Sequence, residues 1–105
     1  MAVDIEEVSK KAKAYATHVR EVFPVSKAYI FGSYSKGTAT LQSDVDVCFF
    51  LESFEGKRRI DIIKELLKLS DGYDDVGFEP LALPATELHN GNPFALEVIN
   101  TGIEI

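Results

Sequence analysis

The stretch IFGSYSKGTATLQSDVDVCFF, residues 30–50, decides how the rest of this sequence is interpreted. It begins with two apolar residues, turns at Gly32 and Ser33, and ends with Asp44 and Asp46 at the start of an apolar run. The residues before the glycine predict the end of one strand, and the apolar run predicts a second strand that is buried on both faces. Charge at the start of a buried strand is costly unless something compensates it.

The spacing of the two aspartates indicates what that compensation is. Asp44 and Asp46 are two residues apart in the predicted strand, so their side chains point to the same face. Two carboxylates whose backbones lie less than about 7 Å apart repel each other unless a cation lies between them. A hard divalent ion with oxygen ligands, magnesium above all, suits this arrangement. We therefore expect half of a metal site at the start of this strand.

The turn at Gly32 supplies a complementary feature. A glycine at the end of a strand lets backbone amides approach a ligand closely, and a short helix that begins there directs its positive end outward. Phosphate oxygens suit such a turn, and Lys36 adds a positive charge nearby. A phosphate-binding turn beside paired carboxylates is what a magnesium nucleotide requires.

The joint pattern carries far more information than a lone Asp-x-Asp pair. It holds six residues at set spacings, namely Gly32, Ser33, Gly37, Ser43, Asp44 and Asp46. GSYSKGTATLQSDVDV resembles the signature of the nucleotidyltransferase superfamily related to DNA polymerase β. The short length resembles the minimal nucleotidyltransferase branch, of the MntA antitoxin type. The closing PFALEVINTGIEI is similar to the end of such domains, so the resemblance extends over the whole chain.

The resemblance implies roles for individual residues on the nucleotide side. Gly32 and Ser33 would hold the nucleotide phosphates. Lys36 would add its charge there, and Ser43 of the same signature would also belong to the nucleotide-binding set.

The resemblance also implies that two magnesium ions are bound by Asp44, Asp46 and a third carboxylate on a later strand. Glu79 is the candidate, because it is the only acidic residue inside the third predicted strand. The family more often has aspartate there, and a glutamate reaches one methylene further, so it can bind a metal or accept the proton of the acceptor hydroxyl. The alternatives, Asp74 and Asp75, stand at the start of that strand.

Hydrophobic periodicity and turn residues predict the remaining elements. We expect helices at residues 5–22, after Gly56 and at 94–100, and strands at 28–31, 44–51 and 76–83. The apolar stripe of the second helix is predicted to hold Ile60, Ile63, Leu66 and Leu67. Their order predicts an α/β (α+β) fold, a small mixed sheet packed with helices like that of polymerase β-like nucleotidyltransferases.

Composition narrows the function classes. The 105 residues predict one domain, 1–105, and 17 acidic against 11 basic residues disfavour direct binding to a nucleic-acid backbone. Cys48 is the only cysteine, so no internal disulfide can form. No apolar run reaches the length of a membrane span, and no signal peptide is recognisable, so we expect a cytoplasmic protein.

We expect an enzyme that moves AMP from ATP to a hydroxyl group, with magnesium as its cofactor. So small a domain has little surface with which to recognise an acceptor, and the resemblance implies a HEPN-domain partner protein in a toxin–antitoxin pair. Two alternatives stay open. The chain could be a weak or inactive docking module that neutralises a HEPN-domain partner, or a small-molecule nucleotidyltransferase that works as a homodimer.

Overall fold

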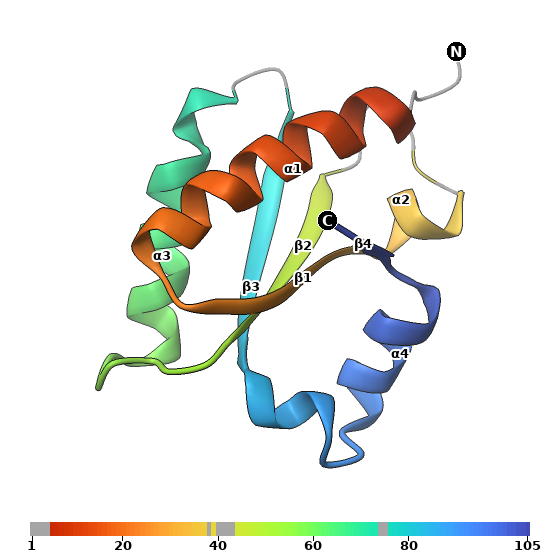
Figure 1. The fold of residues 1–105 in the computed structure, drawn as a ribbon. Helices are drawn as coiled ribbons and strands as arrows, with labels where there is room; N and C mark the ends of the chain where they lie inside the picture. The colour runs from red at the N-terminus through yellow and green to blue at the C-terminus, as the bar shows by residue number, and fades with distance from the viewer. Residues whose placement is uncertain (1–4, 38, 40–43, 74–75) are drawn as a thin grey trace.

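The computed structural model describes the chain except residues 1–4, 38, 40–43 and 74–75 and the side chain of Ser33. In the described residues the helices are α1 (Ile5–Val22), α2 (Ser33–Lys36), α3 (Arg59–Leu69) and α4 (Pro93–Thr101), with 3-10 turns η1 (Ser70–Gly72) and η2 (Ala85–Leu88). The strands are β1 (Val25–Phe31), β2 (Val45–Leu51), β3 (Phe78–Pro84) and β4 (Ile103–Glu104) (Figure 1).

The described strands form a mixed sheet in the order β3-β2-β1-β4. β1 is antiparallel to both β2 and β4, whereas β2 and β3 are parallel. A parallel pair cannot be joined by a tight hairpin, so α3 forms the crossover between β2 and β3. This arrangement confirms the expected fold, a small mixed sheet packed with helices.

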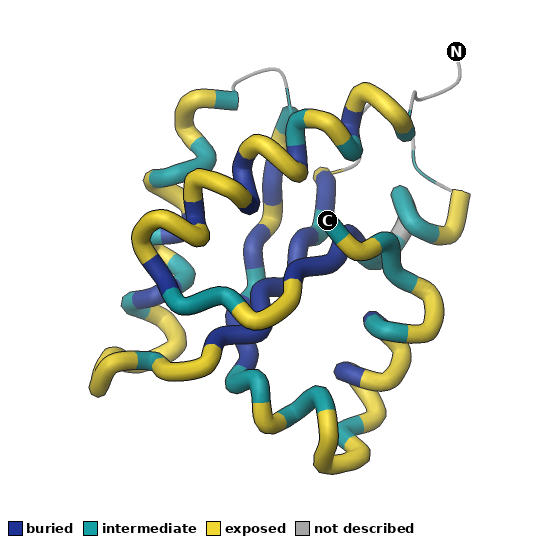
Figure 2. The backbone as a smooth tube through the Cα atoms, viewed as in Figure 1, coloured by how far each residue is buried: buried dark blue, intermediate teal, exposed yellow. Residues whose placement is uncertain are grey.

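Helices cover both faces of the sheet. On one face, α1 and α3 pack in a cluster that includes Tyr15, Phe49 and Leu66. On the other face, α4 packs in a smaller cluster that includes Cys48 and Val98. β2 lies between the two clusters and is buried along almost its whole length, as its continuous apolar run predicted (Figure 2). Cys48 is fully buried in the smaller cluster, and this burial raises the pKa of its thiol to about 12.

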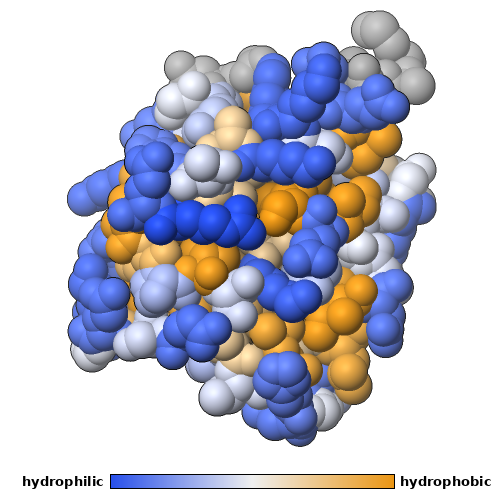
Figure 3. All heavy atoms as spheres, viewed as in Figure 1, coloured by the Kyte–Doolittle hydropathy of each residue, from blue (hydrophilic) through white to orange (hydrophobic). Residues whose placement is uncertain are grey.

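The outer surface of α1 is hydrophilic. Figure 3 shows hydrophilic side chains gathered along this helix, with hydrophobic patches between and below them. Val22, in the last turn of α1, is 49% exposed, although its spacing from the buried Val19 is that of one helix face. Among the described residues, no helix combines the length and the apolar character needed to cross a membrane.

The apolar stripe predicted for α3 was wrong in part. Ile60 and Leu67 are 50% and 44% exposed, whereas Ile62 and Leu66 are fully buried and Leu69 packs against the same cluster. Both sets of residues have helical spacing, so periodicity alone could not separate them. Contact with the sheet decides which set is buried.

The ends of the elements follow the sequence closely, with small differences. Asn92 caps α4, because its side-chain oxygen accepts hydrogen bonds from the backbone N–H groups of Phe94 and Ala95. Pro80 lies in β3, an edge strand of the described sheet, where a missing N–H is tolerated. The short strand β4 was not predicted, because two residues are too few to show a strand pattern.

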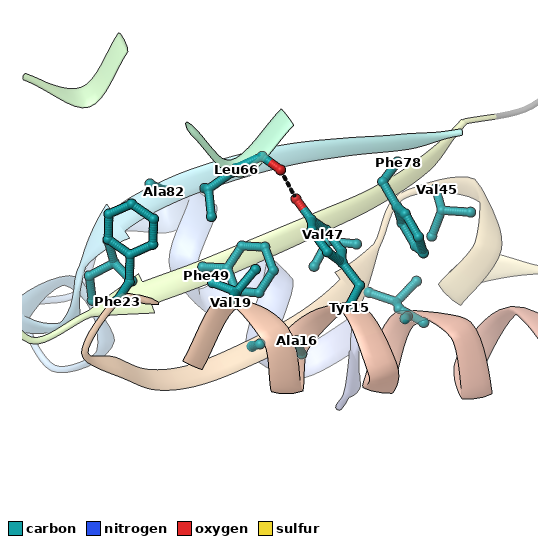
Figure 4. Close-up of a cluster of buried hydrophobic side chains, with 14 of the residues drawn as sticks. Tyr15, Ala16, Val19, Phe23, Val45, Val47, Phe49, Leu66, Phe78 and Ala82 are labelled. Atoms are coloured by element: carbon teal, nitrogen blue, oxygen red, sulfur yellow. Dashed lines mark hydrogen bonds between the residues drawn. The ribbon is translucent and has the colours of Figure 1, made fainter. Parts of the chain in front are cut away.

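Tyr15 ties α1 to α3. Its hydroxyl donates a hydrogen bond of 2.6 Å to the backbone carbonyl of Leu66, and the side chain is fully buried (Figure 4). Its ring meets Phe49 edge-on at 5.5 Å and stacks on Phe78 at 4.7 Å between centroids. The two helices on this face are therefore joined by a polar contact as well as by apolar packing.

We expect Tyr15→Phe to lower the free energy of unfolding by about 1 kcal/mol, because it removes one buried hydrogen bond and keeps the ring. Tyr29→Phe is the matched control, since Tyr29 is also buried but its hydroxyl has no hydrogen bond with the described residues. Chemical denaturation of both variants measures the difference. Equal losses in the two variants would contradict the role given to the Tyr15 hydroxyl.

Candidate active site

Three segments meet at one end of the sheet. The end of β1 lies beside the start of β2, with Phe31 opposite Asp46, and the start of β2 lies beside the start of β3, with Asp46 opposite Glu79. Antiparallel pairing of β1 with β2 and parallel pairing of β2 with β3 together produce this meeting point. Gly32 follows β1 directly and therefore lies close to the carboxylates that the sequence predicted as its neighbours.

The carboxylates point to the sheet face that α4 partly covers. Asp46 has the strand parity of Cys48, and Glu79 has that of Leu83, and both of these apolar residues belong to the cluster beneath α4. Asp46 is half-buried, while Glu79 and Asp44 are exposed. Asp46 and Glu79 therefore lie on the part of this face that remains accessible.

Asp46 interacts directly with Glu79. Burial, a side-chain hydrogen bond with Glu79, the charge of Glu79 and the charge of Asp44 together raise the pKa of Asp46 to about 6. A hydrogen bond between two carboxyl groups requires a proton on one of them, so the pair shares a proton below this pKa. Glu79, from the neighbouring strand, thus forms a hydrogen bond with Asp46, whereas Asp44, which the sequence paired with it, acts on Asp46 through its charge.

Two glycines leave room for the aspartate side chains. A Cβ added to Gly32, whose φ is +74°, would collide with the carboxylate of Asp46. A Cβ on Gly77 would lie only 2.7 Å from Oδ1 of Asp44. Gly77 was missed from the sequence, although its place directly before β3 and two residues before Glu79 was a usable signal.

The donor chemistry of the pair fits a divalent cation. Carboxylate oxygens are the ligands that magnesium prefers, and a cation can replace the shared proton between Asp46 and Glu79. Within the described ranges, however, no three His, Cys, Asp or Glu side chains form a group that could hold a metal ion. Asp44, the remaining carboxylate of the predicted metal-binding set, lies against Gly77.

The structure describes only some of the residues that the sequence predicted to bind the nucleotide. Ser33 begins α2, and the backbone N–H of Lys36 donates to the carbonyl of Gly32 at 3.1 Å. The Lys36 ammonium pairs with Glu97 of α4 at 3.1 Å, a partner that local sequence gave no reason to expect. Ser43 lies outside the described residues.

The two alternatives for the third carboxylate, Asp74 and Asp75, also lie outside the described residues. Among the described residues, Glu79 is the acidic residue that the strand register sets beside Asp46. The role of Glu79 in catalysis stays a prediction.

We expect Gly32→Ala to impair the site more than Gly37→Ala. Both positions have φ near +75°, so both substitutions cost about 1 kcal/mol of stability from backbone strain. Only at Gly32 does the new Cβ meet another group, the Asp46 carboxylate, because nothing lies within 4 Å at Gly37. Thermal unfolding measures the loss of stability, and calorimetric titration with magnesium–ATP measures the loss of binding. Equal binding by the two variants would show that the contact between Gly32 and the Asp46 carboxylate is unimportant.

Asp46→Asn is expected to stabilise the metal-free protein at pH 8 and not at pH 4. The pKa of Asp46 is about 6 in the folded protein and about 4 in the unfolded chain. Ionisation of Asp46 therefore does not reduce the free energy of unfolding below about pH 4. The reduction grows as the pH rises from about 4 to about 6 and is complete above that. Because Asp46 is partly open to water, we expect a gain of only about 1 kcal/mol.

Denaturation in the presence of a chelator measures this gain, since bound cations would stabilise the wild-type carboxylates. Asp71→Asn, an exposed aspartate outside the site, is the control. An equal increase in the free energy of unfolding at pH 4 and pH 8 would contradict the conclusion that the surroundings of Asp46 raise its pKa.

Comparisons with known proteins agree with this geometry. The family model described as a nucleotidyltransferase domain matches residues 12–99. A crystal structure of a candidate nucleotidyltransferase from Sulfolobus solfataricus has a TM-score of 0.61 and 25% sequence identity, covering 74% of this chain and 68% of that one. A mutant form of the toxin–antitoxin complex MntA-HpeT has a TM-score of 0.55 and 20% identity, covering 98% and 72%, which shows a shared fold.

A comparison with curated proteins gives no match. The family model nevertheless spans most of the chain, from within α1 to within α4, and includes every residue of the site described above. The chain belongs to the nucleotidyltransferase domain family.

Proposed function

We propose that this chain is a magnesium-dependent nucleotidyltransferase that moves AMP from ATP to a hydroxyl group on a HEPN-domain protein, as the antitoxin of a toxin–antitoxin pair. The observation that carries the proposal is the register that sets Asp46 beside Glu79, with Gly32 against the Asp46 carboxylate. Family membership supports nucleotidyl transfer. The similarity in fold to a chain of the toxin–antitoxin complex MntA-HpeT supports a toxin as the partner.

The proposed reaction needs few groups from the protein. The acceptor oxygen bonds to the α-phosphorus of ATP, the bond from that phosphorus to the β-phosphate bridge breaks, and pyrophosphate leaves. Asp44, Asp46 and Glu79 would hold magnesium, which supplies charge neutralisation of the triphosphate and a lower pKa for the acceptor hydroxyl. Glu79 is exposed on the edge strand β3, so its carboxylate can also accept the proton that the hydroxyl loses.

The charge of the chain supports a protein acceptor over a nucleic acid. The net charge is −6, and a mean field of that sign repels a phosphate backbone. The carboxylates lie beside the edge strand β3, which leaves them open to a partner that approaches from the side. A hydroxyl on a partner protein carries no charge that this field would repel.

A transfer assay tests the proposal. The chain is incubated with magnesium, ATP labelled at the α-phosphate and a HEPN-domain protein from the same genome, and label on each protein is measured. We expect Asp46→Asn and Glu79→Gln to lower the transfer rate by at least about a hundredfold, because each removes a group that acts on the reacting atoms. Glu52→Gln, an exposed acid just beyond the other end of β2, is the matched control.

The assay also separates the alternatives. A stable complex between the two proteins without transfer would make the chain a docking module. Transfer to a small alcohol by the chain alone would favour the small-molecule enzyme. Full activity of Glu79→Gln would remove this residue from the mechanism.

A further inference from the structure

We infer that a cavity beside Gly32 binds the base of the nucleotide and prefers a base with an exocyclic amino group, as in adenine. The inference rests on the proposed function. The cavity has a volume of about 160 Å³ and lies between the end of β1, α2 and α4. Its lining includes Phe31, Gly32, Lys36, Phe94 and Glu97.

The position of the cavity links it to the carboxylates. Gly32 lines the cavity and also lies against the carboxylate of Asp46. An α-phosphate at Gly32 would therefore have both the Asp46 carboxylate and the cavity as neighbours. In a nucleotide, the group attached to the phosphates through the sugar is the base.

The size and walls of the cavity suit one aromatic ring system. Pockets for whole drug-sized ligands have about 300–1,000 Å³, so a cavity of 160 Å³ accepts a smaller group. The rings of Phe31 and Phe94 meet edge-on at 5.5 Å between centroids, and Phe94 remains 37% exposed. An exposed aromatic ring in the wall of a cavity is a surface on which a base can stack.

The polar side chains that line the cavity determine which base it prefers. The Lys36 ammonium donates to Oε1 of Glu97 at 3.1 Å, and both side chains are about half exposed. An ionised carboxylate only accepts hydrogen bonds, so Glu97 suits the amino group of adenine and repels the keto oxygen that inosine has in its place. The Lys36 ammonium is paired with Oε1 of this carboxylate, so Oε2 is the oxygen that would accept from an amino group on the base.

Calorimetric titration of the intact chain with the magnesium complexes of ATP, ITP and tripolyphosphate tests this inference. We expect ATP to bind about tenfold more tightly than ITP, because ITP leaves the carboxylate without its donor, and about tenfold more tightly than tripolyphosphate, which has no base. Phe94→Ala should weaken ATP binding to the level of tripolyphosphate. Leu96→Ala is the matched control, because Leu96 is a large exposed residue of the same helix that does not line the cavity.

Glu97→Gln tests the preference itself. An amide can present either its oxygen to adenine or its NH2 group to inosine, so the difference between ATP and ITP should fall to about twofold or less. In this variant Lys36 loses its ion pair and could change the binding of the triphosphate. ATP and ITP carry the same triphosphate, so the ratio of their dissociation constants is independent of that change.

The outcomes separate this inference from the proposed function. If ATP, ITP and tripolyphosphate bind equally well and all require magnesium and Asp46, the carboxylate site stands and the base-binding cavity is overturned. If none of them binds, the proposed function falls and the inference falls with it. If Phe94→Ala leaves ATP binding unchanged but weakens a complex with the HEPN-domain protein, the cavity belongs to the partner surface.

Discussion

The parallel pairing of β2 with β3 is the constraint on which the site depends, because it holds Asp46 beside Glu79 on one face of the sheet. Paired strands lie about 4.8 Å apart, so two carboxylates in register cannot avoid each other. The register is held by the apolar residues that follow, from Val47 to Leu51, which are buried on both faces. A slip of one residue would turn Asp46 into the core and Val47 toward the accessible face.

The crowded carboxylates thus lie next to the buried core. Crowded carboxylates oppose folding at neutral pH, while the clusters on both faces of the sheet favour it. The absence of side chains at Gly32 and Gly77 gives the aspartates space that any larger residue would take away. Binding sites commonly hold such strained or crowded groups, and the stability of the surrounding core keeps them in place.

The helix α4 contributes both to the core and to the cavity beside Gly32. Its buried side, with Ala95 and Val98, completes the smaller core cluster. Its flank, with Phe94 and Glu97, lines the cavity beside Gly32 and connects to α2 through Lys36. Because one short helix does both, the position of the cavity relative to the carboxylates is determined by core packing rather than by a loop.

The sequence by itself determined the local features of this protein. These include the end of β1 before Gly32, the buried apolar strand β2 and the cap of α4, because each depends on residues close together in the chain. Only the tertiary structure decided which stripe of α3 is buried, that Glu79 lies opposite Asp46, and that Lys36 pairs with a residue 61 positions away. Periodicity and turn chemistry are local properties, whereas strand register and side-chain pairing between distant segments depend on how the whole core packs.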